Sequence, residues 1–308
     1  VRWLGYLLFA ALGLGLLGAL LIVFAAITAY PSLPSLEMLT DYQPKIPLRV
    51  YTADGYLIGE FGEERRNLVK IETMPKLMLQ AILAAEDERF YQHGGVDYLG
   101  VLRAAYSNFS SGAARQGAST ITMQVARNFF LSKEKTLARK FSEALLAFKI
   151  ENNLSKDQIL ELYINQIYLG QRTYGFAAAA QVYFGKPLNK LNLGEIAMLA
   201  GLPKAPSRYN PMVNPKRAKQ RQQYVLRRMQ ELKLISEEEY RVADKQPVVV
   251  KQEQQEFAVK GEYVAEMVRQ AMYERYQDEA YTKGFNVYTT LLKPHQDAAY
   301  AALRKGLL

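Results

Sequence analysis

A long uncharged run near the N-terminus constrains this chain more than any other feature. No charged residue occurs from Trp3 to Tyr30, and about 20 apolar residues suffice to cross a bilayer as a helix. A cleaved signal peptide has a shorter apolar region and a small-residue cleavage site, whereas this run is long and ends at Tyr30-Pro31. We therefore predict an uncleaved transmembrane anchor over residues 1–30. Arg2 before the run places the N-terminus in the cytoplasm and the remainder of the chain outside it.

Charge and cysteine content narrow the classes of partner and compartment. The 308 residues include 39 Lys and Arg against 30 Asp and Glu, a basic balance that favours an anionic partner such as a phosphate, a nucleic acid or an acidic membrane surface. The absence of cysteine excludes disulfides and thiolate-metal sites, and it suits an oxidising compartment. The two histidines, His93 and His295, are too far apart in the sequence to predict a metal-ligand set.

Periodicity divides the chain after the anchor. Residues 31–47 are rich in Pro and Leu, which is typical of an extended connector. Residues 48–62 are β-rich on both sides of Asp54-Gly55, a favoured tight turn, and predict a hairpin. From about residue 75 to residue 245 the pattern is helical almost throughout. A strand predicted over residues 285–292 has edges to cover, and we expect it to pair with the hairpin. The chain should be mainly α with a small β element.

The stretch EDERFYQHGG, residues 86–95, begins with four charged residues directly after an apolar helical run. A helix over the preceding residues continues its buried stripe to Glu86, while Asp87 should point away from that face. Desolvation raises the pKa of a carboxyl on an apolar face, which suits a general base or acid. The alternative is a structural ion pair with Arg89 or His93 at the end of the helix.

A second charged cluster interrupts an apolar face of the helix predicted over residues 133–151. Arg139 and Glu143 are four residues apart on this face, and Lys140 lies one position round. Charges near a buried face cost free energy unless they satisfy each other. This cluster is therefore a candidate for chemistry, and an ordinary structural salt bridge is the alternative.

Between the two clusters, residues 117–128 combine a Gly-rich bend with the start of a helix near Ser119 or Thr120. A helix start offers backbone N–H groups to an anion, and Arg127 lies two turns along. The pattern thus predicts an anion-binding site here.

At five stretches the chain resembles the peptidoglycan glycosyltransferases of family 51, which form the N-terminal part of class A penicillin-binding proteins. The motifs occur in the family's order, as EDERFYQHGG, GASTITMQ, RKFSE, KDQILELYIN and LAGLPKAPSRYNP. The one departure is Met123, where the family usually has Gln. The resemblance covers about Leu48 to Leu234. It implies a lysozyme-like, two-lobed, mainly α glycosyltransferase domain, truncated before a transpeptidase domain.

The resemblance also implies an activity and a set of site residues. Family members polymerise lipid II into β-1,4-linked glycan strands with inversion and release of undecaprenyl diphosphate. Glu86 would be the general base, and Glu143 the second essential acid. The implied substrate-binding residues are Ser119, Gln124, Arg127, Arg139, Lys140, Asn165 and Lys204. The residues implied to support the first motif structurally are Asp87, Phe90 and His93. No cofactor is required by the sequence, and a divalent cation, Mg²⁺ or Mn²⁺, is left open, with no metal ligand certain.

The implied partners are lipid II, the growing glycan chain, the membrane and other cell-wall synthesis proteins, but not nucleic acid. The resemblance places the chain in the bacterial cytoplasmic (inner) membrane as a single-pass protein, with its catalytic domain on the periplasmic side. Inhibitors that mimic the donor, such as moenomycin, should bind near Arg139, Lys140 and Glu143. Apolar residues of 98–109 should dip into the membrane interface.

The expected domains are an anchor at 1–30, a connector at 31–47, a glycosyltransferase domain at 48–245 and, at 246–308, the start of a linker toward a missing transpeptidase domain. Residues 132–135 match the transpeptidase motif S-x-x-K, but no S-x-N or K-T-G accompanies them, and we interpret the match as coincidence. Two alternatives remain open: a lysozyme-like lytic enzyme that acts on peptidoglycan, and a non-catalytic cell-wall scaffold.

Overall fold

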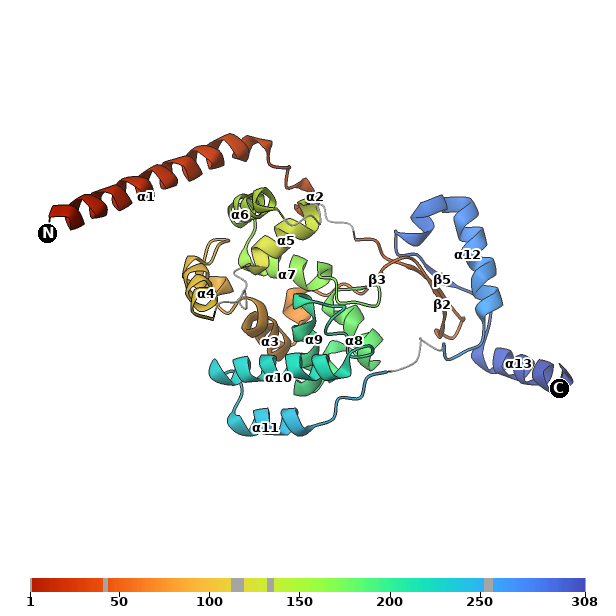
Figure 1. The fold of residues 1–308 in the computed structure, drawn as a ribbon. Coiled ribbons are helices and arrows are strands. Elements are labelled where there is room, and N and C mark those ends of the chain that lie inside the picture. Colours follow the sequence, from red (N-terminus) through yellow and green to blue (C-terminus); the bar gives the residue numbers. More distant parts are fainter. Residues whose placement is uncertain (1, 41–43, 112–118, 132–135, 252–256, 308) are drawn as a thin grey trace. The chain divides into compact units, whose positions relative to one another are not determined.

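The computed structural model describes residues 2–40, 44–111, 119–131, 136–251 and 257–307 (Figure 1). The described chain is mainly helical with a small β element, which confirms the predicted fold class. It divides into two compact units. Unit 1 comprises Val1–Asp41 and Phe90–Ile159, and unit 2 comprises Tyr42–Arg89 and Leu160–Leu308.

The N-terminal apolar run forms one helix, α1 (Arg2–Ala29). The stretch Leu12–Ser32, which begins in α1 and includes the turn after it, is long and apolar enough to cross a membrane, and none of it is buried within the protein. The sequence predicts that the connector after this helix is extended. It is not extended throughout, because it contains a 3-10 turn, η1 (Tyr30–Ser32), and a short helix, α2 (Glu37–Thr40). Proline suits such a turn, since Pro31 occupies its second position, within the first turn, where no N–H is needed.

The remaining elements of unit 1 surround a small apolar cluster. They are η3 (Phe90–Gln92), α4 (Tyr98–Ser111), α5 (Ile121–Phe130), α6 (Leu137–Glu151) and the start of α7 (Lys156–Gln166). Helices α5 and α6 pack on each other, and Val96, Met123 and Ala147 are buried together. Their apolar faces supply most of the stability of such helices.

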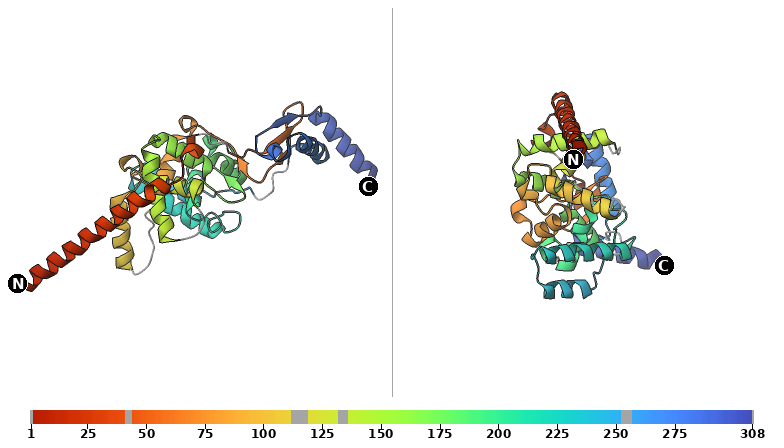
Figure 2. Two further views of the ribbon diagram at one scale, coloured as in Figure 1. Left: turned by 90° about the horizontal axis from the view of Figure 1, so that it is seen from above. Right: turned by 60° about the vertical axis from the view of Figure 1, so that its left-hand side comes forward.

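The helical part of unit 2 is built around α9 (Leu193–Gly201), whose residues after Leu193 are all buried. A helix that is apolar all round lies in the centre of a domain. Helices α3 and α10 both pack on α9, as Figures 1 and 2 show. The other elements of this part are η2 (Ile71–Thr73), α3 (Lys76–Glu86), α8 (Phe176–Phe184), η4 (Leu188–Lys190), η5 (Leu202–Lys204), α10 (Pro215–Glu231) and α11 (Glu237–Lys245). Two short strands, β3 (Arg65–Arg66) and β4 (Thr173–Tyr174), pair in parallel.

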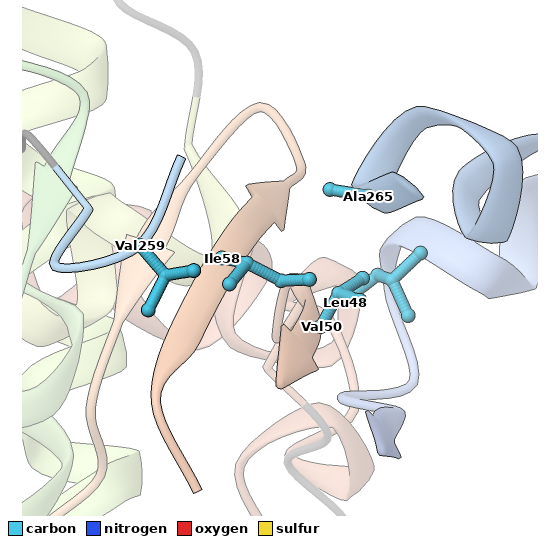
Figure 3. Packing of buried hydrophobic residues seen from close by; sticks show 5 residues of the cluster. All are labelled: Leu48, Val50, Ile58, Val259 and Ala265. Carbon is cyan, nitrogen blue, oxygen red and sulfur yellow. The ribbon is translucent and has the colours of Figure 1, made fainter. Parts of the chain in front are cut away.

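Unit 2 also holds a three-stranded sheet with the order β2-β1-β5. Strands β1 (Leu48–Tyr51) and β2 (Leu57–Phe61) form the predicted hairpin, and β5 (Asn286–Tyr288) pairs with β1 in parallel, as expected. Five side chains form its buried core in Figure 3: Leu48, Val50, Ile58, Val259 and Ala265. The elements that follow or cover the sheet are α12 (Glu262–Tyr276), η6 (Gln277–Tyr281) and α13 (Lys293–Leu307).

Candidate functional site

Glu86 is the last residue of α3, at the end of its buried face. Its side chain is only 10% exposed, and Arg221 Nη2 of α10 lies 3.5 Å from Glu86 Oε1. A guanidinium at this distance stabilises the charged form of a buried carboxyl group. The ionised carboxylate is also the form that a general base needs in order to accept a proton.

Helical spacing predicts that Asp87 rotates away from the buried face of α3, but the helix ends before this residue. Helix α3 ends at Glu86, and Asp87 adopts a non-helical backbone conformation with φ −161° and ψ 79°. The 3.6-residue period therefore no longer applies at Asp87, which is 7% exposed. The next acid, Glu88, forms an ion pair with Arg228 of α10.

Two arginines of α10 thus form ion pairs with two acids of the first motif. Arg221 and Arg228 lie seven positions apart. Residues at that spacing lie on the same face of a helix. Sequence reasoning missed both Arg221 and Arg228 because no motif contains them. One signal could have found Arg221. Helical spacing assigns it to the buried face of the helix over residues 215–231, where an arginine needs a partner.

The rest of the first motif lies in unit 1. Phe90 is buried, and Lys156 Nζ lies 4.4 Å from the centre of its ring. The same Nζ donates to the backbone oxygen of His93 at 2.6 Å. These contacts agree with the structural role predicted for Phe90 and His93. The Tyr91 hydroxyl donates to Asp157 Oδ1 at 2.9 Å, and burial, followed by this hydrogen bond, raises the pKa of Tyr91 to about 12.

Gly95 explains why the first motif ends in glycine. Its φ is +96°, and a Cβ atom at this position would meet the backbone carbon and oxygen of Ala147 on α6 at 3.0 and 3.1 Å. Its oxygen accepts a hydrogen bond from Thr120 Oγ1 at 2.6 Å. Only glycine combines a left-handed conformation with so close an approach. The end of the first motif is therefore fastened to both α5 and α6.

The helix of the second motif, α5, begins where the sequence predicts. Thr120 is its N-cap, and its Oγ1 accepts from the Met123 N–H at 3.2 Å. The first turn is buried and Thr120 caps it from within the chain, and the anion site at this helix start stays a prediction. Gln124 is buried within the helix, and Arg127 is half-buried in its last turn.

Met123 is the residue that departs from the family pattern, and its surroundings are apolar. It is buried with Val96 and Ala147, and Ala144 and Phe148 pack against the same cluster. A thioether fills an irregular apolar gap without requiring a hydrogen-bond partner. Methionine therefore fits this apolar position in this chain.

Four predicted substrate-binding or catalytic residues meet on α6 and beside it. Lys140 Nζ donates to Ser119 Oγ at 2.5 Å and to Glu143 Oε2 at 2.8 Å. Arg139 Nε lies 3.5 Å from Glu143 Oε1. Glu143 is fully buried, whereas the Lys140 side chain is 41% exposed. We call these four residues the α6 cluster.

The α6 cluster has two cations for one carboxylate. Among the described residues, neither Glu143 Oε1 nor Arg139 Nε has a hydrogen-bond partner, although they face each other as an ion pair. The buried carboxylate orients both cations, and within these described residues the positive charges outnumber the negative charges by one. Such a cluster is suited to hold an anionic group such as a phosphate.

Two further predicted residues lie in unit 2. Asn165 Nδ2 donates to the backbone oxygens of Val69 and Glu161, both at 2.9 Å, and Asn165 Oδ1 accepts from Val69 N at 2.9 Å. Both amide hydrogens thus bind the backbone, and the predicted substrate contact of Asn165 stays a prediction. Lys204 is exposed at the end of η5.

The described residues do not form a protein cage for a metal ion. No three His, Cys, Asp or Glu side chains gather anywhere in the described ranges. Glu143 is a single carboxylate that two cations engage, so a Mg²⁺ ion held there would need waters or substrate phosphate oxygens to complete its ligands. The S-x-x-K match at 132–135 lies outside the described residues.

Comparison with known proteins gives one family. A family model described as Transglycosylase matches residues 54–230. Penicillin-binding protein 1A of Neisseria cinerea is 56% identical over 296 residues, which cover 96% of this chain and 37% of that protein. The protein of the same name from Pseudomonas aeruginosa is 50% identical over 278 residues, covering 90% of this chain and 34% of that protein. A crystal structure of penicillin-binding protein 1A from Haemophilus influenzae shares 37% identity with a TM-score of 0.48, covering 84% of this chain and 29% of that one. The chain thus spans little more than a third of the relatives it matches.

Proposed function

Because this chain belongs to the transglycosylase family, we propose that it is a membrane-anchored peptidoglycan glycosyltransferase that polymerises lipid II into β-1,4-linked glycan strands. The family model covers residues 54–230, which contain all five motifs and most of the helical part of unit 2. The proposal therefore rests on motifs that all fall inside the matched region.

The observation that carries the proposal is the α6 cluster. A donor that leaves as a diphosphate develops negative charge on oxygen, and preorganised cations stabilise that charge in the transition state. Arg139 and Lys140 are held by the buried Glu143 at 3.5 and 2.8 Å. A lytic enzyme that cleaves glycan with water needs a pair of carboxyl groups but no such cations. The cluster thus favours transfer over lysis.

The proposed reaction assigns a role to each group. Glu86 takes the proton from the acceptor sugar hydroxyl, whose oxygen forms a bond to the anomeric carbon of the donor. The bond from that carbon to the diphosphate oxygen breaks, the configuration inverts, and undecaprenyl diphosphate leaves. Arg139 and Lys140 bind the leaving diphosphate, and Glu143 orients these two cations. Arg221 pairs with the carboxylate of Glu86 at 3.5 Å and keeps it in place.

The membrane features support the proposed location. Helix α1 can cross a bilayer by length and composition, and a lipid-held substrate requires a site near the bilayer surface. We propose a single-pass protein of the bacterial inner membrane with its catalytic part on the periplasmic side. Lipid II, the growing glycan and the membrane are the proposed partners, and other cell-wall synthesis proteins remain candidates.

The test is polymerisation of purified lipid II in detergent by the parent chain, by Glu86→Gln and by the control Glu274→Gln, in which an exposed carboxylate is changed. The parent and the control should both give long β-1,4-linked glycan, and folded Glu86→Gln should give none. Shortening of added glycan by the parent would support the lytic alternative. Equal behaviour of all three proteins would support the scaffold alternative.

A further inference from the structure

The segment that leaves the membrane helix is fastened to α6 by one lysine. Lys149 Nζ donates to the backbone oxygen of Pro34 at 2.9 Å and reaches that of Leu33 at 3.5 Å. It also lies 6.0 Å from the centre of the Tyr30 ring. Figure 1 follows this segment from the end of α1 to α2, where Leu39 is buried in unit 1. We call residues 30–40 the exit segment.

These contacts are more than the usual interaction of a lysine with its own helix end. Lys149 lies in the last turn of α6, where a cation interacts favourably with the helix dipole. Here, however, the ammonium group donates to carbonyls that lie 115 and 116 residues away in the sequence. A hydrogen bond from a charged donor is stronger than one between neutral groups, and the aromatic ring adds a cation–π contact. Lys149 therefore joins two distant segments.

Helix α6 is also the helix that carries the α6 cluster. Lys149 lies six residues after Glu143, which corresponds to about 9 Å along a helix axis. Both residues belong to the same 15-residue helix. A movement of the exit segment at Lys149 would therefore be transmitted through α6 to Arg139, Lys140 and Glu143.

We propose that Lys149 is a positioning residue that fixes the exit segment to α6 and thereby sets the height of the α6 cluster above the membrane. This inference rests on the proposed function, because the proposed substrate carries its diphosphate at a fixed distance from the membrane. We call the contact of Lys149 with the exit segment the clamp. The clamp can be measured without any substrate.

The chain has no cysteine, so the clamp can be measured with a pair of spin labels. The full chain, labelled at Ser35→Cys and Asn152→Cys, is placed in vesicles of phosphatidylethanolamine and phosphatidylglycerol. Both positions are exposed. We expect a single narrow distance distribution in the parent, a broad one in Lys149→Met and a narrow one again in Lys149→Arg. Tyr30→Leu leaves α6 unchanged and should broaden the distribution partly. An unchanged distribution in both Lys149→Met and Tyr30→Leu would overturn the clamp.

The consequence for activity is measured with lipid II in the same vesicles and, separately, in detergent micelles. Lys149→Met should lose at least five-fold of the polymerisation rate in vesicles and less than two-fold in micelles, where no extended bilayer sets the height of the substrate. Lys149→Arg should restore the rate. An equal loss in both media would show that Lys149 only supports α6, and would overturn the positioning role. If the parent polymerises nothing, the proposed function fails, and the spin-label distances still decide the clamp.

Discussion

Arg221 Nη2 lies 3.5 Å from Glu86 Oε1, although the two residues are 135 positions apart, and their side chains are 6% and 10% exposed. Arg221 is itself held in place, because its Nε donates to the backbone oxygen of Gly201 at 3.2 Å and its guanidinium lies 4.3 Å from the centre of the Tyr224 ring. The proposed general base therefore faces a cation that the core of unit 2 positions.

Loss of Arg221 should impair both folding and catalysis. Arg221→Met leaves a buried carboxylate without this cation, and we expect it to lower the free energy of unfolding by about 3–5 kcal/mol. The rate of polymerisation should fall at least ten-fold, and Arg221→Lys should be intermediate because it keeps the charge but not the planar fork. The control is Arg227→Met, an exposed position of the same helix. Denaturant unfolding and lipid II polymerisation measure the two effects, and parent-like activity of Arg221→Met would contradict this role.

Lys140 and Glu143 should act as one unit. Their ion pair at 2.8 Å predicts a coupling free energy of about 0.5–3 kcal/mol in a double-mutant cycle of Lys140→Met and Glu143→Gln. The two single variants should each lose most of the polymerisation rate, and the double variant should lose little more than either. Strictly additive losses in stability and rate would show that Glu143 does not act through Lys140.

Gly95 should tolerate no side chain. Gly95→Ala combines a φ of +96° with a Cβ position 3.0 Å from the Ala147 backbone, and we expect a loss of about 1–3 kcal/mol in the free energy of unfolding. Gly94→Ala is the matched control, because a Cβ there meets nothing within 4 Å. That change should cost less than about 0.5 kcal/mol. Urea denaturation compares the two, and equal losses would contradict the packing argument.

The Tyr91 hydroxyl should make stability depend on pH in the alkaline range. Its pKa is raised from 10.0 to about 12 in the folded chain, by burial and then by the hydrogen bond to Asp157. A raised folded-state pKa means that its contribution is fully present below pH 10 and is lost as the pH rises to about 12. Tyrosinate absorbance of the parent minus that of Tyr91→Phe isolates this titration. Asp157→Asn should lower the pKa of Tyr91, because the hydrogen bond and the negative charge of Asp157 both raise it. A Tyr91 titration near pH 10 in the parent would contradict this environment.

Helix α4 should contribute to membrane binding independently of α1. Its large apolar side chains Tyr98, Leu99, Leu102 and Tyr106 are exposed, and burying one leucine stabilises by about 1.5–3 kcal/mol. In a chain that lacks residues 1–29, Leu99→Asp or Leu102→Asp should weaken binding to vesicles at least ten-fold. Leu303→Asp on α13, where the leucine is equally exposed, is the control. Unchanged vesicle flotation of the α4 variants would exclude this contact.

Signals confined to a few neighbouring residues predicted local structure well. The capping box at Ser236 and Glu239 is present, and the hairpin around Asp54-Gly55 forms with Gly55 at a φ of +86°. A glycine just after a helical run is typical of a helix C-cap, and Gly185 ends α8 in the left-handed conformation. Gly170 follows a helical run in the same way, but α7 ends at Gln166. The positive φ of +91° at Gly170 belongs to a turn further on, since a glycine marks an unusual backbone angle without specifying which element needs it.

The sequence by itself determined the apolar span, the mainly helical class, the order of the motifs and the residues that could carry chemistry. Hydrophobic periodicity and capping act between residues up to about four positions apart, so they can be recognised in the sequence. The partners of those residues were decided only by the tertiary structure. Arg221 beside Glu86, Ser119 beside Lys140 and the exit segment on Lys149 join positions separated by 135, 21 and more than 100 residues. Such contacts depend on how whole helices pack, and no local spacing encodes that packing.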